Sequence, residues 1–156
     1  MINNSLPSYT ELPSAFAITL DNISAITLSG EEQVKYLQGQ VTCDVDKLTD
    51  EKLLNGAHCN AKGKVFSAFR LLARQDKLLL LQKKDSIEQS LAELKKFGVF
   101  AKVEITQDSE HAYLAVVGEQ ASVKLTELFQ QIPDALTPVI QVNDTTLVYL
   151  AGNISR

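Results

Sequence analysis

The chain has no tryptophan and only two cysteines among its 156 residues. Two cysteines in a chain of this size do not form a disulfide-stabilised scaffold. No apolar run approaches the roughly 20 residues that a membrane-spanning helix needs. The N-terminal stretch MINNSLPSYTELPSAF lacks the charged and apolar regions of a secretory leader. We therefore expect a soluble cytoplasmic protein that has no membrane partner.

Excess positive charge is also missing. The formal net charge is −4 and the isoelectric point is about 5.2. Tight binding to a nucleic-acid backbone depends mainly on surplus Lys and Arg, so this balance argues against direct nucleic-acid binding as the main task. It leaves room for a local basic patch. The sequence also contains no glycine-rich phosphate loop, no internal repeat and no low-complexity tract.

Apolar residues make up 45% of the chain, enough for a core in one domain or two small ones. Asp21-Asn22 predicts a tight hairpin between the β-rich runs 15–20 and 23–28. The pattern predicts short helices near 29–39, 85–98 and 119–132. The last two should each bury an apolar stripe, made of Ile87, Leu91 and Leu94 in one and of Ala121, Leu125, Leu128, Phe129 and Ile132 in the other. Further strands are expected at 53–59, 64–74, 77–84, 99–105, 112–118 and 145–150. The turn NAKG should join the first two of these strands, and the turn Gln75-Asp76 the second and third. Strands and helices in this order, joined by hairpins, indicate an α+β fold.

The last part of the chain predicts a discontinuous domain. Residues 112–150 supply one expected helix and two strands, which is thin for an independent unit. We expect them to pack on the sheet that contains 15–28. The prediction is a loose arm at 1–14, a first α+β domain made of 15–49 plus 111–156, and a second α+β domain, 50–110, inserted into it.

The soft metal ligands Cys43, His58 and Cys59 lie near one another in sequence. They lack the paired spacing of zinc ligands, and adjacent residues on a strand point to opposite faces. The pattern favours structural cysteines and predicts no metal site. A nucleophilic Cys43 with His58 as its base is supported by spacing alone.

Two polar segments that contain glycine are the stronger candidates for a binding site. GQVTCD offers Gln40, Thr42 and Asp44, and NAKG offers Asn60 and Lys62. Placed between apolar strands, such groups suit a heterocycle that needs a few hydrogen bonds in an apolar slot. Ordinary turns contain the same residue types for backbone reasons, and the pattern alone favours that interpretation.

Lys62, Lys64, Arg70 and Arg74 form the densest basic stretch. Even-numbered positions on one strand share a face, so these four side chains are expected to line up unless a bulge intervenes. Such a row suits a polyanionic tail or a phosphate backbone. A solvated strand edge that discourages aggregation is the more common explanation.

The strings LSGEEQVKYLQGQVTCDVDKL and LLNGAHCNAKGKVFSAFRLL resemble the bacterial folate-binding tRNA-modifying proteins. That family is linked to iron–sulfur cluster assembly and is related to the glycine-cleavage T-protein, an aminomethyltransferase. The likeness continues through LKKFGVFAKVEI to the end of the chain. It implies ferredoxin-like units of the aminomethyltransferase folate-binding fold, with the C-terminal part absent. It also implies a tetrahydrofolate cleft whose walls include Gln40, Thr42, Asp44, Asn60, Lys62, Lys64 and Arg70.

Two departures from the related families bear on activity. T-proteins have an acidic pair after the KG turn, whereas this chain has Ser67 and Ala68 there. The C-terminal cysteine motif of the tRNA-modifying family is absent from these 156 residues. The resemblance therefore implies a folate-binding accessory protein for tRNA modification and iron–sulfur maintenance, present as an N-terminal fragment and not catalytic by itself. Its implied partners are folate and the iron–sulfur enzymes of tRNA thiolation, and we expect the fragment to self-associate.

Two alternatives to this function stay open. The first is a tetrahydrofolate-dependent aminomethyltransferase, which needs the carboxylate and the C-terminal domain. The second is a non-catalytic protein-interaction module with a vestigial folate pocket. Turnover of folate-linked one-carbon units would indicate the enzyme, saturable folate affinity without turnover would indicate the accessory protein, and the absence of both would indicate the interaction module.

Overall fold

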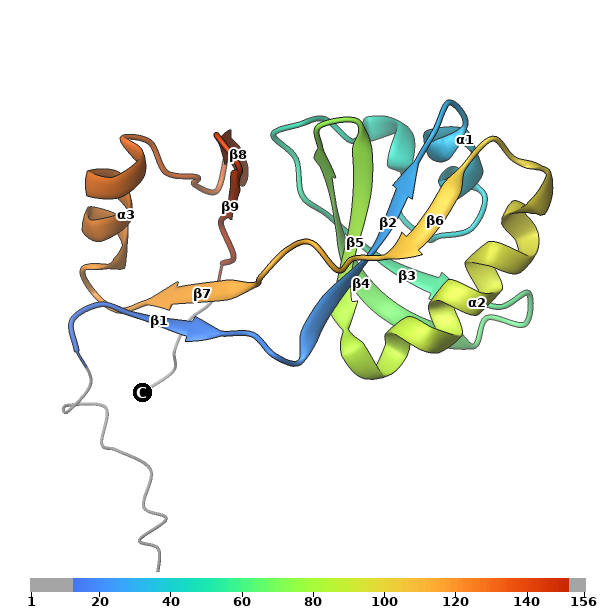
Figure 1. Ribbon diagram of the computed structural model, residues 1–156, viewed down its shortest axis with the longest axis horizontal. Coiled ribbons are helices and arrows are strands. Elements are labelled where there is room, and N and C mark those ends of the chain that lie inside the picture. The colour runs from blue at the N-terminus through green and yellow to red at the C-terminus, as the bar shows by residue number, and fades with distance from the viewer. Residues whose placement is uncertain (1–12, 152–156) are drawn as a thin grey trace, which may run out of the picture.

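A five-stranded antiparallel sheet forms the centre of the computed structural model, which describes residues 13–151 (Figure 1). The arm expected at 1–14 falls almost entirely outside these residues. The strand order is β3-β4-β5-β2-β6. The strands are β2 (Ile23–Ser29), β3 (Leu54–Cys59), β4 (Val65–Arg74), β5 (Lys77–Lys83) and β6 (Glu104–Gln107). The expected α+β class is therefore confirmed.

Two tight turns predicted from the sequence set the register of the three consecutive strands. The NAKG turn joins β3 to β4, and Gly63 there has a positive φ of 78°, which glycine adopts without strain. The turn Gln75-Asp76 joins β4 to β5, and Gln75 has a φ of 55°. These local signals place Leu71 opposite Leu80 and so align the apolar sides of the two strands.

The first face of the sheet is sealed by helices α1 (Gln33–Gln38) and α2 (Ile87–Phe97). The stripe Ile87, Leu91 and Leu94 predicted for α2 packs there, and Leu94 is fully buried. The Tyr36 hydroxyl of α1 donates to the Leu94 carbonyl and links the two helices. Since Leu28 and Leu80 are also fully buried, this side is the main core of the protein.

The second face of the sheet has a smaller core. Leu72, Leu79 and Ala25 pack there against Val139. Val139 begins a hairpin made of β8 (Val139–Val142) and β9 (Thr145–Val148). The Gln141 side chain donates to the Ala73 carbonyl at 3.2 Å, so the hairpin is bound to the end of the sheet by polar as well as apolar contacts.

A second unit lies beside the sheet (Figure 1). Strand β1 (Phe16–Thr19) pairs with β7 (Leu114–Val117) in a separate two-stranded ribbon, followed by α3 (Ala121–Phe129). None of the α3 residues is buried, and Leu128 is 75% exposed. Of the stripe predicted for this helix, Leu128 is exposed, whereas Ala121, Leu125, Phe129 and Ile132 are half-buried.

Two expectations about strand pairing are wrong. Runs 15–20 and 23–28 do not form a hairpin, because β1 pairs with β7 whereas β2 lies between β5 and β6. The division between 15–49 and 50–110 also fails for β2, which shares one sheet with 54–83 and 104–107. Ile26 and Leu28 need burial on the first face, and a two-stranded hairpin cannot provide it. Whether the remaining segments form two separate domains stays a prediction.

The second unit exposes several apolar side chains that should drive self-association. Leu114, Val123 and Leu128 are 57%, 53% and 75% exposed. Large apolar side chains exposed within one small unit can form an association surface. We predict a dimer or larger oligomer by light scattering, and a shift to monomer in a Leu114→Thr/Leu128→Gln double variant. Val99→Thr, at a 71% exposed valine outside this unit, is the matched control. A wild-type monomer at high concentration contradicts the prediction.

Candidate functional site

The segment GQVTCD runs along the outer edge of β3. The Thr42 amide donates to the Ala57 carbonyl at 3.0 Å, and the Thr42 hydroxyl oxygen accepts from the Ala57 amide at 2.9 Å. Val41 forms an isolated bridge with His58. Gln40 is half-buried, and its backbone amide donates to the Leu37 carbonyl. Thr42 therefore anchors the segment to the sheet through both its backbone and its side chain.

Asp44 is paired within its own turn. Its carboxylate lies 2.8 Å from the Lys47 ammonium and accepts a longer hydrogen bond from the Gln38 amide. The hydrogen bond from Lys47 is the largest influence, and it holds the pKa of Asp44 below its usual range. The same contact raises the pKa of Lys47. Asp44 is thus already neutralised by a neighbouring cation.

Asn60 shapes the NAKG turn from inside. Its side-chain oxygen accepts hydrogen bonds from the amides of Lys62 and Lys64, both at 2.9 Å. Its own amide donates to the Lys64 carbonyl, which closes the hairpin. Asn60 therefore has the backbone role typical of turns, and it presents Lys62 and Lys64 as exposed side chains.

The candidate thiol and imidazole have structural contacts. Cys43 packs against the main core, and burial raises the pKa of its thiol. His58 is buried, with its Nδ1 atom 2.9 Å from the Ser90 hydroxyl. Burial lowers the pKa of His58. Among residues 13–151, no group of three or more His, Cys, Asp or Glu side chains is placed to hold a metal ion.

Ser67 and Ala68 point to opposite faces of β4. Ser67 is buried on the first face, with its hydroxyl 3.5 Å from that of Ser90. Ala68 is exposed on the second face. Strand alternation therefore means that only position 68 could present a carboxylate to a ligand on the second face.

The second face has an exposed region beyond the β8–β9 hairpin, which we call the open face. Strand register places Asn55 beside Arg70, and Arg70 beside Leu81. Ala57 lies beside Ala68 in the next row. The open face consists of residues that are all exposed or half-buried, namely Asn55, Ala57, Ala68, Arg70, Leu81 and Lys83. Ala57, Ala68 and Leu81 are apolar and surround Arg70, and Lys83 lies at the margin beside the hollow.

A hollow of about 410 Å³ adjoins the open face. It forms because the ladder between β4 and β5 begins at Phe69, which leaves the first residues of β4 without a β5 partner. Beyond Lys83 the chain turns away through Lys84–Ser86 into α2. Its lining residues are Val65, Phe66, Ser67, Ala68, Lys83, Asp85, Ser86 and Gln89. The hollow is shallow and open to solvent, so it can border a bound ligand but cannot enclose one.

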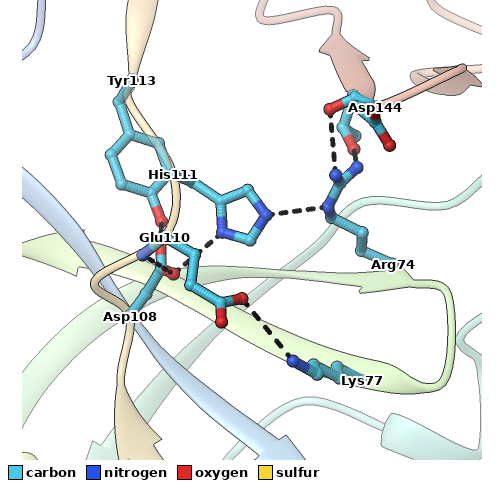
Figure 2. A network of polar contacts seen from close by, with 8 residues as sticks. Arg74, Lys77, Asp108, Glu110, His111, Tyr113 and Asp144 are labelled. Carbon is cyan, nitrogen blue, oxygen red and sulfur yellow. Dashed lines mark hydrogen bonds and ion pairs between the residues drawn. The ribbon is translucent and has the colours of Figure 1, made fainter.

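Arg74 does not join the expected row of basic side chains. Unlike the exposed Arg70, it is only 9% exposed and takes part in a polar network (Figure 2). It donates to His111 Nε2 at 3.0 Å, to the Thr146 hydroxyl at 3.0 Å and to the Asp144 carbonyl at 2.9 Å. The sequence interpretation missed this network because DSEH, at 108–111, reads as an ordinary polar loop.

Asp108 is the acceptor at the other end of the network. It accepts hydrogen bonds from Tyr113 and from the Glu110 amide, and it contacts His111 Nδ1 at 2.8 Å (Figure 2). Burial acts to raise the pKa of Asp108, but these hydrogen bonds outweigh it and keep the pKa below its usual range. Burial and the adjacent carboxylate raise the pKa of Tyr113. Asp108 is therefore held as an ionised acceptor.

The sequence is similar to curated bacterial proteins over nearly its whole length. It is 56% identical over 154 residues to the tRNA-modifying protein YgfZ of Colwellia psychrerythraea, covering 99% of this chain and 48% of that protein. Its identity to the YgfZ protein of Yersinia enterocolitica is 42% over 142 residues, covering 91% and 43%. No family model matches. The chain is thus a YgfZ homologue that spans about half the length of the curated relatives it matches, and the resemblance stated from its motifs is confirmed.

Comparison with solved structures confirms the fold. The glycine cleavage system aminomethyltransferase T from Bartonella henselae superposes with a TM-score of 0.66 at 18% identity. The match covers 73% of this chain and 32% of that protein. At this identity the likeness concerns the aminomethyltransferase fold alone. Within residues 13–151, no helix combines the length and apolarity needed to cross a membrane.

The contacts of Asn60 predict that it acts through the turn. Asn60→Ala removes an acceptor for two amides and should lower the free energy of unfolding by about 1 kcal/mol. Asn60→Asp retains the acceptor oxygen and should lose less. Urea unfolding of both variants measures the difference. Equal losses in the two variants, or none in either, would show that the side-chain oxygen does not support the turn.

Proposed function

We propose that this YgfZ homologue contributes part of a tetrahydrofolate-binding site and acts as a cytoplasmic accessory protein in tRNA modification and iron–sulfur cluster maintenance. The observation that carries the proposal is the open face together with its adjoining hollow. The tRNA role is suggested by the name of the relatives, and the folate role by the motifs and the aminomethyltransferase fold.

The chemistry of the open face suits a folate. Folates combine flat rings with a carboxylate tail, and a site for them needs apolar surface together with a cation that can reach the tail. Ala57, Ala68 and Leu81 offer that surface, and Arg70 and Lys83 supply positive charge. Arginine binds carboxylates through two parallel hydrogen bonds, so Arg70 is the residue we assign to the tail.

The other proposed cleft residues have more limited roles. Lys62 and Lys64 are exposed on the NAKG turn and can add positive charge near the ligand. Thr42 and Asn60 hold the backbone that forms the wall, and Asp44 is paired with Lys47. Gln40 remains a candidate for a direct hydrogen bond. We therefore propose that direct contacts come mainly from the cationic residues, whereas the polar residues of the two segments position them.

We predict weak tetrahydrofolate binding, because one exposed wall cannot bury most of the ligand. A few hundred Å² of apolar surface left in water costs several kcal/mol at about 25 cal/mol per Å². By calorimetry, the dissociation constant of the chain should be weaker than micromolar. Arg70→Ala should weaken it by about fivefold, which corresponds to roughly 1 kcal/mol. Lys124→Ala, which removes an equal charge from the exposed face of α3, should leave it unchanged.

Two calorimetric results would contradict this assignment. Equal affinities of wild type and Arg70→Ala would move the site away from the open face. The absence of saturable binding at millimolar tetrahydrofolate would remove folate binding from the function of this chain and favour the interaction module.

Aminomethyl transfer is a second candidate function, and the position of Asp85 is the observation in its favour. It is the one carboxylate among the residues that line the hollow, where Ala68 replaces an acidic residue of T-proteins. We nevertheless predict no transfer from an aminomethyl donor to tetrahydrofolate, since Asp85 is exposed and retains ready access to water. The measurement is methylene-tetrahydrofolate formation by wild type and Asp85→Asn. Transfer by wild type that Asp85→Asn abolishes would establish the second function instead.

A further inference from the structure

Arg74 connects the sheet to two other segments through one guanidinium group. Its Nη1 and Nη2 atoms donate to Thr146 and to the Asp144 carbonyl, which belong to the β8–β9 hairpin. Its Nε atom donates to His111, in the segment between β6 and β7. A guanidinium is planar, and its five donors keep fixed directions. The contact with His111 therefore helps to orient the two donors that hold the hairpin.

The hydrogen bonds define the protonation state of His111. Arg74 can only donate, so His111 Nε2 must be an acceptor and carry no proton. The proton of the neutral ring then lies on Nδ1, which donates to Asp108 Oδ1 at 2.8 Å. The arrangement in Figure 2 therefore requires the neutral Nδ1–H tautomer.

Several charged groups surround this imidazole. Asp108 contacts it from the same segment, and the Tyr113 hydroxyl donates to the second oxygen of that carboxylate. Arg74 approaches from β4. Lys77 of β5 pairs with Glu110 at 3.8 Å. From the hairpin, Asp144 lies on the far side of Arg74 (Figure 2).

Protonation affects the two neighbours of His111 differently. The bond to Asp108 persists in both states, because Nδ1 carries a proton in each. The bond from Arg74 survives only in the neutral state, because protonated Nε2 becomes a second donor and the ring becomes a second cation. Histidine side chains ordinarily change charge between about pH 5 and 8. Protonation of the ring can therefore break the Arg74 contact while Asp108 still holds the ring.

We propose that His111 and Arg74 form a proton-sensitive latch that holds the β8–β9 hairpin on the second face of the sheet. Protonation of His111 turns the Arg74 guanidinium away and releases Thr146 and the Asp144 carbonyl. Val139 of the hairpin covers Leu72 and Leu79, so release of the hairpin exposes these two leucines. These leucines are on the same face as Arg70 and Leu81, so opening the latch enlarges the open face.

The tautomer of His111 tests the latch in the wild-type chain. Long-range ¹H–¹⁵N spectra distinguish a ring protonated on Nδ1 from one protonated on Nε2. The latch requires the Nδ1–H form wherever the hairpin is protected and a doubly protonated ring wherever that protection is lost. His58 is the only other histidine of the chain and provides an internal reference. An Nε2–H tautomer near pH 7.5 would overturn the proposal.

Hydrogen exchange tests release of the hairpin. After correction for the intrinsic pH dependence of exchange, protection of the β8–β9 amides should fall about tenfold between pH 7.5 and 5.5. Protection of β4 and β5 should stay constant. In His111→Gln, which cannot be protonated but keeps an acceptor oxygen, the hairpin should show no such change. Unchanged protection in wild type, or an equal fall in the variant, would contradict the latch. If the variant does not fold, hydrogen exchange of the wild-type chain and the tautomer of His111 still test the latch.

Discussion

Burial of Leu28, Leu80 and Leu94 between the sheet and α2 is the interaction on which the other features depend. All three side chains are fully buried, and they come from β2, β5 and α2. Their packing assigns one face of the sheet to the core. Strand alternation then directs the neighbouring residues, among them Ala68 and Arg70, to the other face. The sealed face thus determines which side chains can meet a ligand.

The second face is divided between a cover and a binding surface. The β8–β9 hairpin covers Leu72 and Leu79, Leu81 packs at the border of this core, and Ala68 and Arg70 are exposed beyond it. Arg74 lies at the covered end and Arg70 at the exposed end of the same strand face. Two arginines four residues apart therefore have different roles, one structural and one proposed for ligand binding. The polar network around Arg74 decides how much of this face is covered.

Local signals in the sequence predicted much of the sheet. The NAKG turn, the turn at Gln75-Asp76 and the apolar stripe of α2 all depend on residues close in the chain, and all three are present. The pairing of β1 with β7 joins 16–19 to 114–117, and a propensity for a turn at Asp21-Asn22 contains no information about that partner. Strand β8 escaped prediction because Val139–Val142 is short and follows a proline.

The candidate site was predictable only in part for the same reason. The structure places GQVTCD along β3 and NAKG at the turn that follows β3, and their role as walls of a ligand site stays a prediction. Their polar residues gave no indication that Thr42 and Asn60 bind backbone groups, because that depends on the register of β3. Ala57 and Leu81 are apolar, so no local pattern marks them as residues of a binding site. His111 lies 37 positions from Arg74, too far for a local pattern to connect them.

The central claim is that ligand contacts fall on the second face of the sheet and that the first face is sealed. Mapping amide chemical-shift changes during a tetrahydrofolate titration tests it most directly. The account predicts saturable changes at Ala57, Ala68, Arg70 and Leu81, with little change across α1 and along α2 beyond its first turn. Changes centred on those helices, or confined to α3 and the β1–β7 ribbon, would contradict it.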